Sequence, residues 1–414
     1  MTASASDLSP IQWSKWADNP YPLYKVLRDQ GPIFHDAPNN AYLVTRYDEV
    51  FQVLADVERF SNIPANLLDT APNDRISTLR NADPPRHTWI RAIVMPLFTS
   101  REMRRLDPYF KQLSAELLDK VEEGDTVEVS SQIAIPLPGR VTCDLLGVPD
   151  EKKARFLDLT AERLRLMNVQ TRSGDSYATG PSGLLPTDRT FLEVRNELWE
   201  TIEPIMAARR QKPEHDAITL LAQAQDKVGT DQLPNEIIID LLLQLLTGGF
   251  HTTQHLLEMF IDLLADRDDI WQRLRADPSL IPAAIEEMLR LDPPVQALPR
   301  RAREDMELFG MQIPKNANLM MVYGAANHDE RVFADPETYS LDREGKRHTS
   351  FSAGIHICPG APVSRFEVKA LLEEMAIRYK RIERAGPTRI RATGQTTVNA
   401  MHGREHVPVR FVRA

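Results

Sequence analysis

The stretch FSAGIHICPG, Phe351–Gly360, stands directly before a helical pattern that runs from Ala361 to about Tyr379. The N–H groups and the positive dipole end of that helix would stabilise an anionic sulfur on Cys358, which just precedes it. Gly354 and Gly360 would let the backbone approach a flat macrocycle closely. The stretch therefore predicts a cysteine-ligand loop at 351–360, with the Cys358 thiolate as a metal ligand.

The chain has two cysteines, and they stand in different contexts. A lone cysteine near a turn is most often a small buried core residue, and this interpretation suits Cys143 in the segment VTCDLLGVP. For Cys358, the preceding phenylalanine, the two glycines and the following helix favour the ligand interpretation. A disulfide framework needs more thiols than two, so we expect a reducing compartment.

Composition excludes several classes of protein. The 414 residues carry a formal net charge of −9, whereas nucleic-acid binding needs a basic footprint, so we expect no nucleic-acid partner. The N-terminus has no apolar segment of signal-peptide length. The longest apolar run, Ile237–Phe250, contains Asp240 and Gln244 and falls short of the ~20 residues that a membrane span requires. We expect a cytoplasmic protein with no membrane contact.

Apolar residues at three- and four-residue spacing predict helices over most of the chain. The longest, from about Pro234 to Asp266, carries Gly248-Gly249 at its middle, where each glycine costs about 1 kcal/mol relative to alanine. A strand is predicted at Ala41–Thr45, and a stretch without an apolar stripe predicts a mobile loop at about 168–189. The sequence predicts one mainly α domain, residues 1–414, with a small β portion.

From the cysteine loop outward, the chain resembles the cytochrome P-450 family, which carries Phe-x-x-Gly-x-x-x-Cys-x-Gly at its ligand. Further segments resemble family motifs in the same order along the chain: Asn19–Tyr21, Arg86–Arg91, Glu287–Arg290, Pro299–Ala302, Gly324–Asp329, Phe333–Pro336 and Val407–Val409. Taken alone, Glu287 and Arg290 would more often be a surface ion pair worth about 0.3 kcal/mol. The joint pattern covers almost the whole chain, so each motif supports the others.

The resemblance implies the triangular, mostly α P-450 fold. It places haem b between the helix that contains Gly248–Thr253 and the helix that begins at Ala361. It also implies the residues that bind the cofactor. Cys358 would ligate the metal, and the expected cofactor-binding residues are His87, Arg91, Arg300, Phe351, His356 and Gly360.

The cluster Gly248–Thr253 resembles the family's oxygen-binding motif, in which small residues make room for dioxygen and the threonine hydroxyl helps deliver protons. The candidate catalytic residues are Gly249, His251 and Thr252. The two glycines could instead mark a close helix–helix contact. The family usually has an acidic residue at position 251, but the charge of histidine also changes near neutral pH. His251 is therefore either part of a proton relay or a structural residue.

Three further positions depart from the family's pattern. Ser352 stands where the family has glycine, and His328 stands where it more often has arginine. The arginine usually found a little before the cysteine loop is absent from its expected place. We expect Arg343 to complete the cluster with Glu287 and Arg290 in its stead.

The resemblance implies a haem-dependent monooxygenase that inserts one oxygen atom from O2 into a small or medium hydrophobic substrate, by hydroxylation or oxidative demethylation. Apolar candidates for the substrate pocket support this, because ligand pockets are mostly apolar. They are Leu245, Leu246, Val295, Ala297, Leu298 and Met401. A terpenoid, an aromatic compound and a steroid all remain open. Electrons are expected from a separate ferredoxin with an NAD(P)H-dependent reductase.

Two other functions would use the same cysteine. A peroxide-driven haem-thiolate oxidase would turn over with hydrogen peroxide alone. A non-catalytic haem sensor would bind the cofactor without a substrate-dependent change in its spectrum. Thr252 and the apolar pocket candidates favour the monooxygenase.

Overall fold

The computed structural model of the chain describes residues 3–8, 10–63, 79–170, 190–224, 233, 235–345, 347–390 and 401–414. Most of the expected mobile loop, residues 171–189, lies outside these ranges, and residues 168–170 continue helix α7 (Asp150–Gln170). The mainly α architecture with a small β portion, in one domain, is confirmed.

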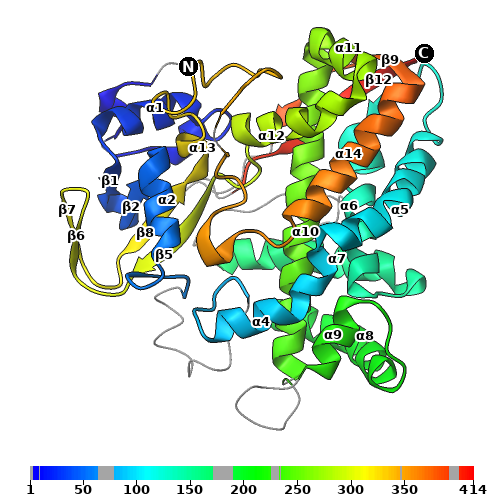
Figure 1. Cartoon of the computed structure of the whole chain (residues 1–414), viewed down its shortest axis with the longest axis horizontal. Helices are drawn as coiled ribbons and strands as arrows, with labels where there is room; N and C mark the ends of the chain where they lie inside the picture. Colours follow the sequence, from blue (N-terminus) through cyan, green and yellow to red (C-terminus); the bar gives the residue numbers. More distant parts are fainter. Residues whose placement is uncertain are drawn as a thin grey trace.

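Figure 1 shows a lobe that contains the larger sheet beside a larger helical lobe. The sheet has five strands in the order β1-β2-β8-β5-β3. Their bounds are β1 (Ile33–Asp36), β2 (Ala41–Val44), β8 (Asn318–Val322), β5 (Ala297–Ala302) and β3 (Phe60–Ser61). β2 and β8 pair in parallel, and the other neighbours are antiparallel. All four residues of β2 are buried, as suits an inner strand covered on both faces.

The helical lobe is built around α10 (Asn235–Asp266), which runs through its centre with α14 (Ala361–Arg378) beside it (Figure 1).

The other described α-helices of the two lobes are α1 (Tyr21–Gln30), α2 (Tyr47–Ala55), α4 (Arg86–Val94), α5 (Ser100–Leu118), α6 (Pro136–Leu146), α8 (Phe191–Gln211), α9 (Ala217–Gln223), α11 (Asp268–Ala276), α12 (Ile281–Leu291) and α13 (Tyr323–Ala326). The remaining strands form small sheets: β4 (Val127–Glu128), β12 (Pro408–Arg413) and β9 (Tyr379–Arg384); β6 (Met306–Leu308) and β7 (Met311–Ile313); β10 (Arg389–Ile390) and β11 (Arg404–His406).

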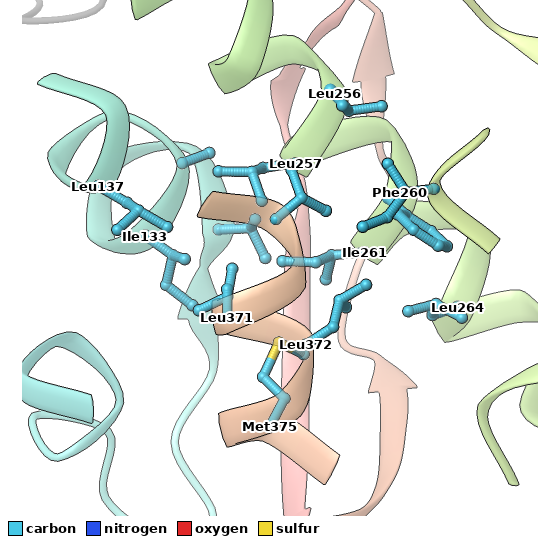
Figure 2. Close-up of a cluster of buried hydrophobic side chains, with 14 of the residues drawn as sticks. Ile133, Leu137, Leu256, Leu257, Phe260, Ile261, Leu264, Leu371, Leu372 and Met375 are labelled. Atoms are coloured by element: carbon cyan, nitrogen blue, oxygen red, sulfur yellow. The ribbon is translucent and has the colours of Figure 1, made fainter. Parts of the chain in front are cut away.

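A buried apolar cluster fixes α14 against α10. Figure 2 shows Leu257 and Ile261 of α10 directed toward Leu371 and Met375 of α14. All four side chains are at most 1% exposed, and the three- and four-residue spacing puts each pair on one helix face. Burying such side chains stabilises the fold by about 1.5–3 kcal/mol each. The packing fixes where α14 begins, and therefore where the preceding Cys358 lies.

Within the part of the chain that the structure describes, no helix is both long and apolar enough to cross a lipid bilayer. The longest apolar run of the sequence, Ile237–Phe250, lies in α10, whose residues Leu242, Leu243 and Leu246 are fully buried.

Candidate haem site

Cys358 lies half-buried just before the first turn of α14. Its own N–H donates to the carbonyl oxygen of Phe351 at 2.9 Å, which closes the loop. Burial raises the pKa of the Cys358 thiol, and hydrogen bonds from the backbone N–H groups of Gly360 and Ala361 oppose that rise. These donors are the helix N-terminus that the sequence predicted for stabilising a thiolate.

The loop holds an unusual backbone shape. Gly354 has φ +64°, and a Cβ added there would lie 2.5 Å from the carbonyl oxygen of Leu54, so only glycine fits. Ser352 also has a positive φ, of 63°, which explains why glycine is usual at this position. In this chain, the hydroxyl of Tyr323 donates to Ser352 Oγ at 3.2 Å, and Arg347 donates to the Ser352 carbonyl oxygen at 2.7 Å.

Four nitrogen-rich side chains meet beside the loop. The rings of His87 (α4) and His356 lie 4.1 Å apart between centroids, and Arg91 and Arg300 lie close enough to influence the charge of His356. Burial, with Arg91 adding to it, lowers the pKa of His87 to about 4. Burial, followed by the influence of His87, lowers that of His356 to about 3.

Among the described residues, this cluster has more cationic side chains than anions. Both ring nitrogens of His87 are buried without a hydrogen-bond partner among the described residues, although buried polar groups are normally paired. Asp83 is the acid that affects both His87 and Arg300, but Ser61 and Arg303 already donate to its carboxylate. Two further carboxylates would satisfy the cluster. The residues present therefore fit a haem, with its propionates at this cluster and its iron at Cys358.

The two adjacent glycines at the middle of α10 have different surroundings. A Cβ on Gly249 would lie 2.9 Å from Thr142 Oγ1 on α6, whereas a Cβ on Gly248 would meet nothing within 4 Å. Gly249 therefore makes a close helix–helix contact, and Gly248 faces open space. The room beside the helix that was expected at Gly249 therefore lies at Gly248. Thr252, one turn on, donates its hydroxyl to the carbonyl oxygen of Gly248 at 2.6 Å.

A chain of polar side chains begins at His251 on the same helix. His251 Nδ1 lies 3.3 Å from Gln254 Oε1, and Gln254 Nε2 donates to Glu258 Oε1 at 2.8 Å. His255 Nδ1 lies 3.0 Å from Glu258 Oε2. Gln254 and Glu258 are fully buried. Sequence reasoning missed them, although positions 251, 254, 255 and 258 have the spacing of one helix face.

The six expected pocket residues divide into two groups. Leu246 and Ala297 are fully buried within hydrophobic clusters, so they are packed against protein. Leu245, Val295, Leu298 and Met401 are half-buried; the first three also pack against hydrophobic clusters, so only part of each side chain is left uncovered. Val295 pairs with Met401 through an isolated β-bridge, which brings two of these four together.

The structure brings together the residues of the expected Glu–Arg cluster. Arg290 and Arg343 donate to Glu287 at 2.8 and 2.9 Å, and Glu287 and Arg290 are buried. Burial alone would raise the pKa of Glu287, but hydrogen bonds from Arg290 and Arg343 lower it. Arg343 thus completes the cluster, and the surface-pair interpretation is wrong.

His328 and Cys143 have structural positions. The His328 ring is fully buried and stacks on Tyr21 with centroids 4.3 Å apart. Its Nε2 lies 2.7 Å from the carbonyl oxygen of Leu291, so it joins α1 to α12. Cys143 is fully buried, and burial raises its pKa to about 12, which makes it a core residue.

Comparisons relate this chain to known proteins. A family model described as Cytochrome P450 matches residues 11–386. The 6-deoxyerythronolide B hydroxylase of Saccharopolyspora erythraea is 30% identical over 389 residues, 90% of each chain. The mycinamicin IV hydroxylase/epoxidase of Micromonospora griseorubida is 31% identical over 364 residues, 86% of this chain and 87% of the relative. The crystal structure of CYP109E1 from Bacillus megaterium with testosterone superposes with a TM-score of 0.80 at 29% identity, over 95% of this chain and 99% of that one.

Proposed function

Because the chain belongs to the cytochrome P450 family and is a haem-dependent monooxygenase, we propose that it oxidises a small or medium hydrophobic compound, by hydroxylation or oxidative demethylation. The observation that supports this most is the pairing of a helix-capped thiol at Cys358 with the anion-deficient cluster of His87 and His356. The cofactor we propose is haem b, held without a covalent link to the chain.

A bound haem would supply the iron at which dioxygen is reduced, and Cys358 would donate electron density to it. The chain's own residues then have separate tasks. His87, Arg91, Arg300 and His356 would hold the propionates through charge-assisted hydrogen bonds. Thr252 would hold a proton at Oγ1, next to the open side of Gly248.

The substrate class follows from the half-buried apolar side chains Leu245, Val295, Leu298 and Met401. Such a lining favours a hydrophobic molecule with few polar groups. The solved relative with bound testosterone has a similar fold, so a steroid belongs among the candidates, beside terpenoids and aromatic compounds. Optical titration of the ferric protein with a library of these three classes tests the proposal, because a substrate that displaces iron-bound water changes the spin state. No spectral change with any class would contradict it.

For the redox partner we propose an acidic ferredoxin served by an NAD(P)H-dependent reductase. Arg101 and Arg104 at the start of α5 are exposed. Arg347 and Arg365 flank the cysteine loop, although Arg365 is paired with Glu286. Arg105 is paired with Glu102, and Lys346, the neighbour of Arg347 in the sequence, lies outside the described residues.

Electrostatically steered association weakens as salt rises. Reduction by ferredoxin should therefore slow with ionic strength and with Arg104→Glu. Reduction at a rate that changes with neither ionic strength nor Arg104→Glu would contradict a basic docking face.

We propose a cytoplasmic location, where such partners and reduced thiols occur.

Turnover by the same protein distinguishes the proposed function from the two alternatives, a peroxide-driven oxidase and a haem sensor. A peroxide-driven oxidase would form product with hydrogen peroxide and gain nothing from ferredoxin, reductase and NAD(P)H. A haem sensor would form no product with either. We expect product only when the electron donors and O2 are both present.

A further inference from the structure

Glu258 is a carboxylate enclosed in the protein, at 0% exposure, in the second half of α10. Three nitrogen atoms surround it. Gln254 Nε2 and His255 Nδ1 lie 2.8 and 3.0 Å from its two oxygens, and the backbone N–H of Arg404 donates to Oε2 at 3.3 Å. A Cβ on Gly403 would lie 2.2 Å from His255 Nδ1, so only glycine lets this backbone approach the helix.

The acceptor nature of Glu258 determines which way Gln254 points. Its oxygens accept hydrogen bonds from Gln254 Nε2 and from the Arg404 N–H, so the NH2 end of the Gln254 amide faces Glu258. The amide oxygen then faces His251 Nδ1 at 3.3 Å. Because a carbonyl oxygen cannot donate, Nδ1 of His251 must carry the hydrogen. In the neutral ring, Nε2 then holds the lone pair.

We infer that Gln254 and Glu258 are positioning residues, which hold His251 in its Nδ1–H tautomer so that Nε2 is the atom that accepts a proton. This inference rests on the proposed monooxygenase function, in which His251 and Thr252 manage protons. It extends that function to two residues that lie beyond the oxygen-binding motif. Histidine replaces the usual acid at position 251, and an acid needs no tautomer to be set. Gln254 and Glu258 are therefore needed to set the tautomer because position 251 is a histidine.

The isosteric change Glu258→Gln gives the sharpest test. An amide at position 258 can donate as well as accept, so it no longer forces Gln254 to present its NH2. Gln254 can then rotate and donate to His251 Nδ1, which favours the Nε2–H tautomer. The matched control is Glu116→Gln, the same change at the exposed pair with Arg140.

The tautomer can be read directly by nitrogen NMR of protein labelled with 15N-histidine. The ferrous carbon monoxide complex is diamagnetic and suits the measurement, and His251→Asn assigns the signal. We expect Nδ1–H in the unchanged protein and in Glu116→Gln, and a shift toward Nε2–H in Glu258→Gln. An unchanged His251 signal in Glu258→Gln, or an Nε2–H ring in the unchanged protein, would overturn the inference.

A second measurement connects the tautomer to the reaction. Glu258→Gln and Gln254→Leu should lower the yield of product per NAD(P)H on the order of tenfold and release the difference as peroxide, with substrate affinity and haem content unchanged. In a His251→Asp background, Glu258→Gln should have no further effect, because aspartate has no tautomer. Coupling that stays intact while the tautomer shifts would exclude the two residues from proton delivery. Absence of a thiolate–carbon monoxide spectrum would instead contradict the proposed function.

Discussion

The imidazole rings of His87 and His356, from α4 and from the cysteine loop, lie 4.1 Å apart with their planes at 47°. His87 is 1% exposed, and burial lowers the pKa of both rings, to about 4 and about 3. Two neutral rings can share this space, but two protonated rings would repel each other. An anion between them and the neighbouring arginines removes that conflict, which is why the pair supports a propionate site.

Part of the pH dependence of the haem-free protein follows from His87. Its pKa is about 4 in the folded state and about 6.5 when unfolded, so the unfolded chain binds more protons between these values. The stabilisation is therefore complete above pH 6.5 and is lost as the pH falls toward 4. The loss attributable to His87 is on the order of 3 kcal/mol at most. Denaturant unfolding of haem-free protein at several pH values measures it.

His87→Gln should make this dependence shallower, because glutamine does not titrate, while the contribution of His356 remains. His35→Gln, at an exposed histidine, is the matched control and should leave it unchanged. If haem-free His87→Gln lost stability with acid as steeply as the unchanged protein, the assignment to His87 would be wrong.

The metal ligand can be tested independently of any substrate. Reduced protein with carbon monoxide should show the red-shifted Soret band of a thiolate-ligated haem. Cys358→His should abolish this band, whereas Cys143→Ala should keep it, because Cys143 lies in the core. Persistence of the band in Cys358→His would contradict the assignment.

The two glycines of α10 should respond oppositely to alanine. At Gly248 the new methyl group meets nothing within 4 Å, so helix propensity should raise the free energy of unfolding by about 1 kcal/mol. The methyl group would, however, fill space beside Thr252 and slow product formation. At Gly249 it would lie 2.9 Å from Thr142 Oγ1, and such overpacking costs about 1–3 kcal/mol.

Thr142→Ala removes the obstructing atoms and should restore the stability of Gly249→Ala. Urea unfolding of the two single variants and the double variant measures the coupling. Additive effects of Gly249→Ala and Thr142→Ala would show that the close contact does not determine the cost.

The features that the sequence predicted best are those whose partners lie close together along the chain. The cysteine loop and the following helix are one continuous segment, so their geometry follows from local rules. Arg343 could be predicted as the third member of the Glu287–Arg290 cluster, because the resemblance supplied the pair and one candidate arginine stood nearby. The structure bears out that prediction.

The features that could not be predicted depend on how distant elements cross. Gly249 faces Thr142 because α6 packs on α10, and no local pattern specifies that contact. Leu246 and Ala297 were assigned to the pocket from sequence position alone. A rotation of one residue along a helix, or of one position along a strand, exchanges a cavity face for a core face. His328 stacks on Tyr21 from another part of the chain.

Ser352 tests how the cysteine loop tolerates a side chain where glycine is usual. Its φ of 63° costs about 1–2 kcal/mol for a residue with a Cβ, and the hydrogen bond from the Tyr323 hydroxyl offsets part of that cost. Ser352→Ala keeps the strain and loses the bond, so it should lower the free energy of unfolding by about 1 kcal/mol. Ser352→Gly loses the same bond but relieves the strain, so it should stay near the unchanged protein.

Tyr323→Phe removes the same hydrogen bond from the other side. Combined with Ser352→Ala, it should cost little more than either change alone, which a double-mutant cycle in denaturant measures. Arg347 donates to the backbone of Ser352. Ser352→Ala, Ser352→Gly and Tyr323→Phe should therefore keep the backbone conformation of the cysteine loop and the carbon monoxide spectrum. If Ser352→Gly proved clearly less stable than Ser352→Ala, backbone strain would not be the quantity that the Tyr323 hydroxyl offsets.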